Sequence, residues 1–169
     1  MSLATRLRAR GAARIGAALL LATLAACGSA RTVSFKSITF EKAPRDVVFK
    51  ACKDVVTSHY YSTRIGVDEA GGRIETDPVE ESVGREALQQ QVYVRVDTLA
   101  GGDVVVELMA TLARLKVDPS RTPAAEWRVY ASDVVVEGRL LDEISGRVLS
   151  LASDARVVAS TVPKEARPR

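Results

Sequence analysis

The spacing of apolar residues along the chain predicts strands interrupted by one clear helix. Residues 33–40 are rich in β-branched and aromatic side chains and indicate a strand. In residues 45–60 the apolar side chains recur at three- and four-residue spacing, which is typical of an amphipathic helix. Pro44 suits the first turn of that helix, where its missing N–H leaves no hydrogen bond unmade. A helix with one apolar stripe needs a surface to cover, and a sheet is the expected partner.

The middle of the chain alternates apolar and polar residues with period two, and it predicts two hairpins. Residues 62–68 and 73–77 flank a turn at 69–72, which contains a Gly-Gly pair that can adopt the positive φ of a tight turn. Two longer strands, 89–98 and 103–117, are joined through a second Gly-Gly turn. Consecutive strands linked by such short turns run antiparallel.

Three segments depart from this alternation. The apolar residues of the second long strand share one face as far as Leu112, whereas Leu115 and Val117 fall out of phase, which predicts a bulge in this strand. Residues 78–86 are polar and acidic, and residues 118–125 contain two prolines. Both of these segments are therefore expected to be loops.

The last part of the chain fits two structures. Residues 126–131 predict a short strand with Trp127 on one face. As a helix, residues 133–149 would begin at Ser132 or Asp133 as the N-cap and carry an apolar stripe. The members of this stripe are Val136, Leu140, Leu141, Ile144 and Val148. As a hairpin, the same segment would form two short strands. The caps and the four-residue spacing favour the helix.

The predicted elements belong to the α+β class. We expect an antiparallel β-sheet of about five to six strands with one or two helices packed on one face, a helix-grip-like arrangement. The single domain is expected to span residues 33–160. The tail at 161–169 contains two prolines and alternating charges, so it is expected to be disordered.

One part of this layout resembles the helix-grip domains of small envelope lipoproteins, such as the C lipoprotein of the β-barrel assembly machinery. The resemblance runs from Ala43 and Pro44 through the first helix to the segment 71–77. It covers roughly a third of the chain that follows Cys27 and is a pattern of elements, not a specific motif. It implies an architecture alone and carries no catalytic residues.

The first 26 residues are typical of an export signal. Four arginines and no acidic residue occur among them, and residues 15–24 form an uncharged apolar run. A helix of that run would be about 15 Å long at roughly 1.5 Å per residue. This is too short to cross a hydrocarbon core of about 30 Å. Residues 1–26 are therefore predicted to be a signal peptide.

The residues that end this signal resemble the lipobox of bacterial lipoproteins. Leu24, Ala25 and Ala26, a branched apolar residue and two small ones, precede Cys27. The resemblance implies that a signal peptidase recognises these three residues and cleaves before Cys27, whose sulfur carries the lipid. The alternative is an ordinary secretory signal with a cysteine there by chance. Residues 27–32 would then be a short lipidated tether that holds the domain close to its membrane.

Two further residues bear on compartment and localisation. Gly28 follows the predicted lipid site, where an Asp commonly retains Gram-negative lipoproteins in the inner membrane. The resemblance thus implies the periplasmic face of the cell envelope, with the outer membrane favoured. Cys52 is left as the single thiol after Cys27 is acylated, so no internal disulfide can form. Its place on the apolar face of the first helix predicts a buried, unreactive side chain.

The charge of the chain argues against binding to nucleic acid. The formal net charge of +3 falls close to −1 once the arginines of the signal are removed, because 20 basic residues then face 21 acidic ones. Binding to a phosphate backbone requires a clustered basic surface. The excess positive charge belongs to the predicted export signal, and no nucleic-acid partner is expected.

No set of residues predicts catalysis, a metal site or a cofactor. His59 is the single histidine, and its position at the end of the first helix favours a structural or capping role. An acidic cluster surrounds the first hairpin and could attract a divalent cation, although a solvated acidic rim is the simpler interpretation. The cluster consists of Asp68, Glu69, Glu75, Asp77, Glu80 and Glu81. The glycine turns lack the spacing of a phosphate-binding loop.

Aromatic residues near arginine supply the remaining candidate site. Tyr93 alternates with Arg95, and Trp127 and Tyr130 flank Arg128, a composition that is common at protein contacts. Packing of Trp127 in the core is the competing interpretation. We therefore expect a non-enzymatic binding or scaffolding module, anchored to the membrane through Cys27, with an envelope protein as a possible partner. The alternative is a carrier that holds a small hydrophobic or lipid ligand between helix and sheet.

Overall fold

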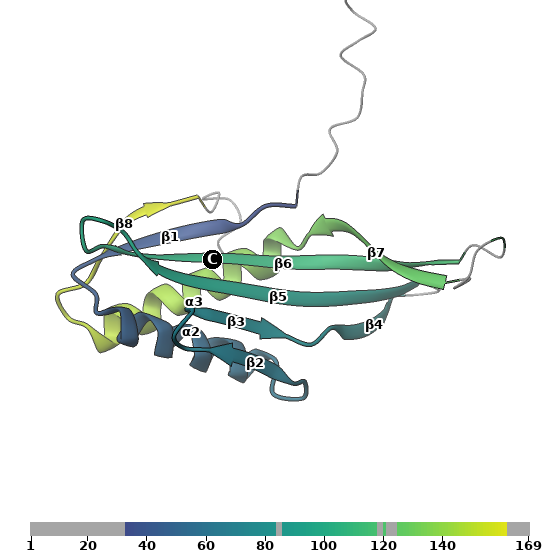
Figure 1. Ribbon diagram of the computed structural model, residues 1–169, viewed down its shortest axis with the longest axis horizontal. Coiled ribbons are helices and arrows are strands. Elements are labelled where there is room, and N and C mark those ends of the chain that lie inside the picture. Colours follow the sequence, from purple (N-terminus) through teal and green to yellow (C-terminus); the bar gives the residue numbers. More distant parts are fainter. Residues whose placement is uncertain (1–32, 84–85, 118–119, 121–124, 162–169) are drawn as a thin grey trace, which may run out of the picture. The chain divides into compact units, whose positions relative to one another are not determined.

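A computed structural model describes residues 33–83, 86–117, 120 and 125–161 of the chain (Figure 1). The predicted signal peptide, the lipidated tether and all but the first residue of the predicted tail lie outside these ranges. The lipobox residues Leu24, Ala25, Ala26 and Cys27 are among them, so their predicted roles stay predictions.

The described residues form an antiparallel sheet of eight strands and two helices, in the order β1-α2-β2-β3-β4-β5-β6-β7-α3-β8. The strands are β1 (Lys36–Glu41), β2 (Ile65–Asp68), β3 (Arg73–Thr76), β4 (Val79–Val83), β5 (Glu86–Thr98), β6 (Val104–Val117), β7 (Ala125–Ser132) and β8 (Arg156–Ser160). The helices are α2 (Arg45–His59) and α3 (Val134–Leu151). The α+β class is confirmed, and the predicted number of strands was too low.

The sheet is built around the two longest strands. β5 and β6 pair without a break from Leu88 opposite Arg114 to Thr98 opposite Val104. The full order is β2-β3-β5-β6-β1-β8, while β4 pairs with β5 beyond β3 and β7 pairs with β6 beyond β1. Both flanks of the central pair are thus made of two strands placed one after the other. This arrangement divides the sheet into two ends.

Helices α2 and α3 cover one face of the sheet at one of these ends (Figure 1). Helix α2 begins after Pro44, which is its N-cap and not a residue of its first turn. Helix α3 begins after Asp133, whose Oδ1 accepts a hydrogen bond from the backbone N–H of Val136 at 3.1 Å. This N-cap satisfies a donor that a helix leaves unpaired. The helical interpretation of residues 133–149 is therefore confirmed.

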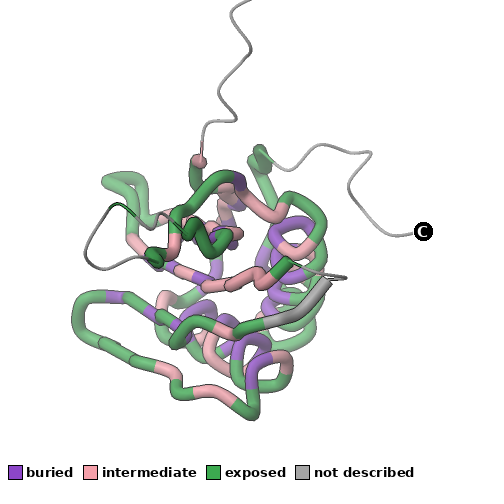
Figure 2. Tube along the Cα trace, turned by 90° about the vertical axis from the view of Figure 1, so that its right-hand side faces the viewer, coloured by how far each residue is buried: buried purple, intermediate pink, exposed green. Residues whose placement is uncertain are grey.

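The core lies between the helices and the sheet, and Figure 2 shows the buried positions gathered there. Alternate residues of β5 and β6 point to the helices, as the period-two pattern predicted. The fully buried members of this layer include Val48 and Val56 of α2, Val96 and Val106 of the sheet, and Leu140, Leu141, Ile144 and Val148 of α3. Burial of these apolar side chains is the main stabilising contribution to the fold.

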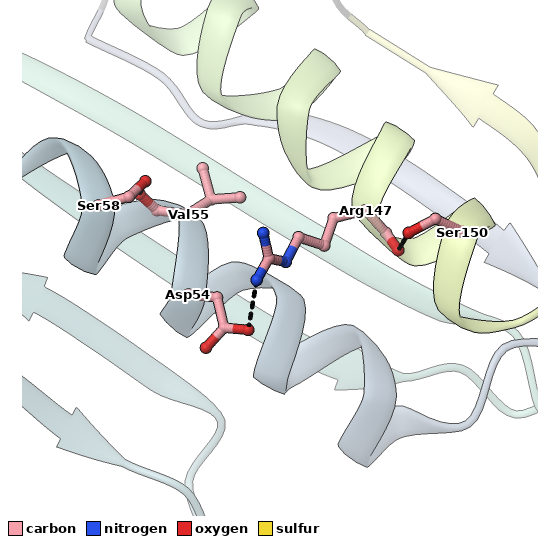
Figure 3. Close-up of polar contacts among 5 residues, drawn as sticks. All are labelled: Asp54, Val55, Ser58, Arg147 and Ser150. Carbon is pink, nitrogen blue, oxygen red and sulfur yellow. Dashed lines mark hydrogen bonds and ion pairs between the residues drawn. The ribbon is translucent and has the colours of Figure 1, made fainter.

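Polar contacts join the solvent-facing sides of the two helices (Figure 3). Arg147 of α3 donates to Asp54 Oδ2 of α2 at 3.1 Å. His59, the last residue of α2, lies 2.7 Å from Glu143 Oε2 of α3 through its Nε2. The predicted structural role of His59 at the end of the helix agrees with this contact. The two pairs align α2 and α3 above their shared core.

The prediction of a loop at residues 78–86 was wrong, because β4 occupies most of this segment. β4 pairs with β5 from Val79 opposite Gln90 to Val83 opposite Glu86. Its acidic residues suggested a loop, but an edge strand can carry charges. Pairing with a neighbour decides the structure of such a segment more than its intrinsic propensity does.

The prediction of a bulge in the second long strand was also wrong. The register shift occurs between β6 and β7, where Leu112 and Ala113 face Ala131 and Val129. The extra residue is Tyr130 of β7, and β6 itself alternates without interruption. Leu115 is out of phase because it points away from the helices.

The last strand, β8, was not predicted. It pairs antiparallel with β1, and all five of its residues are exposed. The hydrogen bond from the Thr161 N–H to the Ser37 carbonyl, 2.9 Å long, extends the pairing by one residue. The alternation in Arg156–Ser160 is weak because neither face of this edge strand is buried.

Candidate interaction surface

The two ends of the sheet differ in what covers them. At one end, which we call the proximal sheet, β5 and β6 are flanked by β3 and β1 and carry the two helices. At the other end, the distal sheet, β4, β7, residues 86–91 of β5 and residues 111–117 of β6 extend beyond the helices (Figure 1). The distal sheet is therefore a four-stranded layer in which Val79 and Gln90, at the end nearest the helices, still contact the core or the helix ends, while its strands continue beyond the two described helices.

Both flanking strands change at the same level of the sheet, which we call the junction. On one side, β3 pairs with β5 as far as Tyr93, and β4 takes over at Gln90. On the other side, β1 pairs with β6 as far as Leu108, and β7 takes over at Thr111. At such a change, backbone groups of the central strands lose their neighbouring strand and need other partners.

Side chains supply these partners at the junction. Thr76 Oγ1 accepts the hydrogen bond of the Val92 N–H at 3.1 Å. Glu137 Oε1 accepts the hydrogen bond of the Ala110 N–H, also at 3.1 Å. Val92 and Ala110 lie directly opposite each other in β5 and β6. The two side-chain oxygens therefore satisfy the outward N–H groups on both sides of the Val92–Ala110 pair, where the flanking strands are interrupted.

The Glu137 side chain has no exposed area, which the other carboxyl groups of described burial do not share. Burial raises the pKa of its carboxyl group, and the hydrogen bond from the Ala110 N–H and the charge of Lys36 oppose that rise. Its Oε2 and the Ser132 Oγ are the two buried side-chain oxygens without a hydrogen bond among the described residues. Burial without full hydrogen bonding favours the protonated form. The sequence gives no sign of this role, because an acidic residue in a first helical turn usually faces solvent.

A polar chain seals the end of the core beside the junction. The Tyr60 hydroxyl donates to Gln90 Oε1 at 2.7 Å. Gln90 Nε2 in turn donates to Asp133 Oδ2 at 2.9 Å. One glutamine of β5 thus links the end of α2 to the start of α3. The helical layer ends at these three residues, and the distal sheet begins there.

The outer face of the distal sheet, which points away from the helix side, carries an apolar strip. Leu115 lies opposite Trp127, and Ala113 lies opposite Val129 across β6 and β7. Leu115 is 37% exposed and Val129 is 54% exposed. Val117, at 66%, continues the strip toward the end of the strand. Several adjacent exposed apolar side chains are typical of an interaction surface.

The opposite face of the distal sheet is charged. Arg114 Nη2 lies 3.0 Å from Glu86 Oε2, and its guanidinium carbon lies 4.8 Å from the centre of the Tyr130 ring. Arg128 forms an ion pair with Glu126 on the same strand. In the β6–β7 half of this layer the two faces therefore differ in chemistry, with an apolar strip on the outer face and charged residues on the helix-side face. The outer face of the β4–β5 half is polar and carries Glu80 and Gln89.

The structure separates the three predicted contact residues. Trp127 is half-buried in the apolar strip, whereas Tyr130 is the bulged residue beside Arg114. Tyr93 pairs with Met109, six residues along β6 from the partner of Trp127, a spacing of about 20 Å at roughly 3.3 Å per residue. The role of Trp127 in partner contact stays a prediction, and sequence reasoning did not single out Leu115 or Val129 as members of this surface.

Tyr93 lies at a separate, shallow cavity of about 220 Å³ on the outer face of the proximal sheet. Burial raises the pKa of its hydroxyl, and the Glu75 carboxylate raises it further. The cavity is lined by Phe35, Arg73, Ile74, Glu75, Tyr93, Val94 and Arg95. Its lining mixes both signs of charge, so it favours no particular ligand.

A second cavity, about 450 Å³, lies along α2 beside the β2–β3 turn. The Arg45 guanidinium donates to the Glu69 carbonyl at 3.3 Å, and Lys53 Nζ lies 3.1 Å from Glu69 Oε1. The cavity is lined by Arg45, Asp46, Phe49, Lys50, Lys53, Asp54 and Glu69. Its basic groups already bind the turn, and acidic groups balance them. Part of the predicted acidic cluster thus anchors the hairpin to α2.

The β2–β3 turn also shows why a glycine is needed. Gly72 has φ +65°, and a Cβ there would lie 2.3 Å from the Val96 carbonyl oxygen. Its own carbonyl accepts the Val96 N–H at 2.8 Å. The positive φ predicted for this turn is confirmed at Gly72. Close approach to β5 makes this position unsuitable for a side chain.

The single thiol that the structure describes lies inside the core. Cys52 is fully buried, and burial raises the pKa of its thiol, as expected for an inert side chain. Within the described ranges, no three side chains of His, Cys, Asp or Glu gather in a way that could hold a metal ion. Nor does either described helix have the length and apolar character that crossing a membrane requires.

Comparison with known proteins assigns no family to the chain. No family model matches the sequence, and no curated protein matches it significantly. Function must therefore be argued from the residues and their arrangement.

Proposed function

We propose that this protein is a membrane-anchored envelope lipoprotein that acts as a non-enzymatic binding or scaffolding module through its distal sheet. The observation that carries the proposal is the contrast between the two ends of one sheet. Helices cover the proximal end, whereas the distal end has an exposed apolar strip on one face. A sheet face normally packs against another layer, so an uncovered apolar strip favours contact with a partner.

The proposed anchor would keep this surface near the membrane. Cys27 and the first strand at Lys36 are separated by eight residues, which span about 30 Å when fully extended at roughly 3.6 Å per residue. A diacylated cysteine carries two acyl chains, which is enough for stable attachment. The partner is therefore expected to be another component of the envelope, within reach of a tethered domain.

The filled interface between helices and sheet supports binding at the surface over transport of a ligand inside. Leu140, Ile144 and Val148 of α3 have no exposed area, and neither do Val96, Val106 and Leu108 of the sheet, which belong to the same core cluster. A carrier requires an internal cavity for its apolar ligand. The apolar side chains buried between helices and sheet favour surface binding over such a carrier.

Site-specific crosslinking in the native envelope tests the binding surface. A photoreactive residue replaces Val129 of the distal strip in the full chain, and the matched control replaces Leu149, an exposed residue of α3. We expect crosslinked products containing another envelope protein from position 129 and none from position 149. Equal labelling at both positions, or no product at 129, would contradict the proposal.

Fractionation tests the anchor independently of the surface. The Cys27→Ser variant lacks the sulfur that would carry the lipid. We expect it to lose the mass of the acyl chains and to remain unprocessed or leave the membrane fraction. An unchanged mass and an unchanged distribution would show that Cys27 is not the anchor.

A further inference from the structure

The free edge of β7 is a second uncovered feature of the distal sheet. β7 pairs with β6 on one side, and no described strand pairs with its other side. Its sequence, AEWRVYAS, contains neither proline nor lysine, and the protective features that it does carry are the charges of Glu126 and Arg128 and the bulge at Tyr130. A free edge offers unpaired N–H and C=O groups to an incoming strand.

We propose that this edge pairs with β7 of a second copy of the chain, antiparallel, about a two-fold axis at Trp127. The inference deepens the proposed function by naming one partner of the distal sheet. It rests on the proposed function in one respect, which is that the distal sheet is the part of the molecule that binds partners. It does not require the lipid anchor.

Strand geometry limits the possible two-fold registers. Residues that lie directly opposite each other in an antiparallel pair point to the same face of the sheet. A two-fold axis perpendicular to the sheet must therefore pass through a residue that faces itself, because an axis between two residues would pair opposite faces. In the regular part of β7, the choices are Glu126, Trp127, Arg128 and Val129.

Charge selects among these registers. Centring on Glu126 or on Arg128 places two like charges directly opposite each other, which destabilises a strand pair. Centring on Trp127 instead places Glu126 of each copy opposite Arg128 of the other, so two complementary pairs form. Centring on Val129 brings the bulged Tyr130 into the pairing, where a ladder is interrupted.

Both faces of the Trp127 register are complementary. On the outer face, the two Trp127 rings meet, and Ala125 of each copy faces Val129 of the other. These side chains continue the apolar strip of Leu115 and Val117 across the axis. On the helix-side face, Glu126 and Arg128 are 44% and 45% exposed and already pair within one strand. Dimerisation would exchange the two pairs within the strands, one in each copy, for two pairs between the copies.

The size of this contact predicts a weak dimer. One short strand pair with a row of apolar side chains is smaller than a standard stable interface of about 1,600 Å². Confinement of tethered copies to a membrane surface would raise their effective concentration and favour the pairing. In solution, we therefore expect a monomer–dimer equilibrium that depends on protein concentration.

Reciprocal charge reversal provides a direct test. Glu126→Arg leaves two positive charges on the helix-side face of β7, and Arg128→Glu leaves two negative charges there. Each variant alone should dimerise at least ten-fold more weakly than the wild type. Mixed in equal amounts, the two variants should form a heterodimer, because every opposing pair is then complementary.

The measurement uses the full chain, extracted in detergent, with sedimentation equilibrium for mass and native mass spectrometry of one isotope-labelled variant for heterodimers. Lys50→Glu, an exposed charge reversal on α2, is the control and should dimerise like the wild type. Circular dichroism verifies that each variant is folded. Loss of dimers on either single reversal and their return on mixing would support the pairing.

Two results would overturn this inference. One is a wild-type protein that stays monomeric at the highest concentration reached, and the other is a dimer that neither charge reversal weakens. Neither result would touch the proposed function, whose measurements are crosslinks to other envelope proteins and membrane fractionation. Conversely, if the lipid anchor or the crosslinks to other envelope proteins are not found, purified protein should still dimerise, because the pairing of β7 requires neither.

Discussion

The proximal and distal ends of this sheet share two continuous strands but are stabilised in different ways. At the proximal end, the valines of β5 and β6 are buried under α2 and α3, and burial of apolar area stabilises the layer. At the distal end, β4 and β7 extend the hydrogen-bonded ladder without a covering layer. Hydrogen bonding between strands can therefore extend a sheet beyond its hydrophobic core when that core stabilises the other end of the same strands.

Along β6, the apolar residues move from the helix-facing side of the sheet at the proximal end to the outer face at the distal end. Apolar residues face the helices as far as Leu112, and beyond that point Leu115 and Val117 occupy the outer face. The phase changes while the strand continues without a bulge. Such a switch of face within one regular strand marks where the core ends and where an exposed apolar surface begins.

The largest predicted difference between the two ends concerns stability. Leu140→Ala removes a side chain with no exposed area from the core, and we expect it to lower the free energy of unfolding by about 2–5 kcal/mol. Leu115→Ala truncates an exposed residue of the distal strip and should change that free energy by about 0.5 kcal/mol or less. Chemical denaturation of both variants measures the contrast. Similar losses in the two variants would show that the distal strip belongs to the folding core.

The junction should give effects of intermediate size. Thr76→Val keeps the shape of the side chain but leaves the buried Val92 N–H without its acceptor, which should cost about 1–3 kcal/mol. The loss should appear as a lower midpoint of denaturation with an unchanged slope. Thr63→Val, a change of the same kind at a half-buried loop residue, is the control. An equal effect at both positions would remove the special role of the junction.

Glu137 makes the stability of the junction depend on pH. Its pKa is raised above the ordinary value of 4.5 in the folded protein, so the folded state holds the proton more tightly than the unfolded state does. The associated stability is fully present below pH about 4.5 and is lost as the pH rises through the raised pKa. Glu137→Gln keeps an acceptor for the Ala110 N–H and should remove this dependence. Chemical denaturation from pH 4 upward measures the free energy of unfolding of both proteins. An identical dependence of that free energy on pH would contradict a raised pKa of Glu137.

Periodicity predicted what is buried and missed what pairing alone determines. The alternating valines of β5 and the spacing in α3 each gave the correct element and the correct inner face, because burial imposes a period on the sequence. The strand β8 left no such period, since all five of its residues are exposed, and β4 was missed because its pairing with β5 decides its structure. Their structure depends on neighbours that are distant in sequence.

The candidate surface was predictable only in part for the same reason. Trp127 was identified because an aromatic residue near arginine is common at protein contacts. Leu115 and Val129 could be recognised only after β6 and β7 were known to pair beyond the helices. Glu137 gave no signal at all, because its burial follows from the break between β1 and β7.

The distal strip should tolerate polar substitutions in folding but not in binding. Val129→Ser makes an exposed position of β7 polar, and we expect a change in the free energy of unfolding of about 0.5 kcal/mol or less. The same change should reduce the yield of crosslinks from a photoreactive residue at position 117, farther along the same strip. The control is Leu149→Ser on α3, which should leave that yield unchanged. If the Val129→Ser variant gives the same yield of crosslinks as the wild type, the apolar strip does not bind the partner.

A similarly small effect on stability is expected for the polar contacts above the proximal core. Asp54 and Arg147 join α2 to α3 with side chains that are 34% and 52% exposed, so water and salt screen their attraction. A double-mutant cycle with Asp54→Ala and Arg147→Ala should give a coupling of about 0.2–1 kcal/mol that declines with added salt. A larger coupling that salt does not change would mean that the helices depend on this pair. The buried apolar layer would then contribute less to the stability of the proximal end than we infer from comparing the proximal and distal ends.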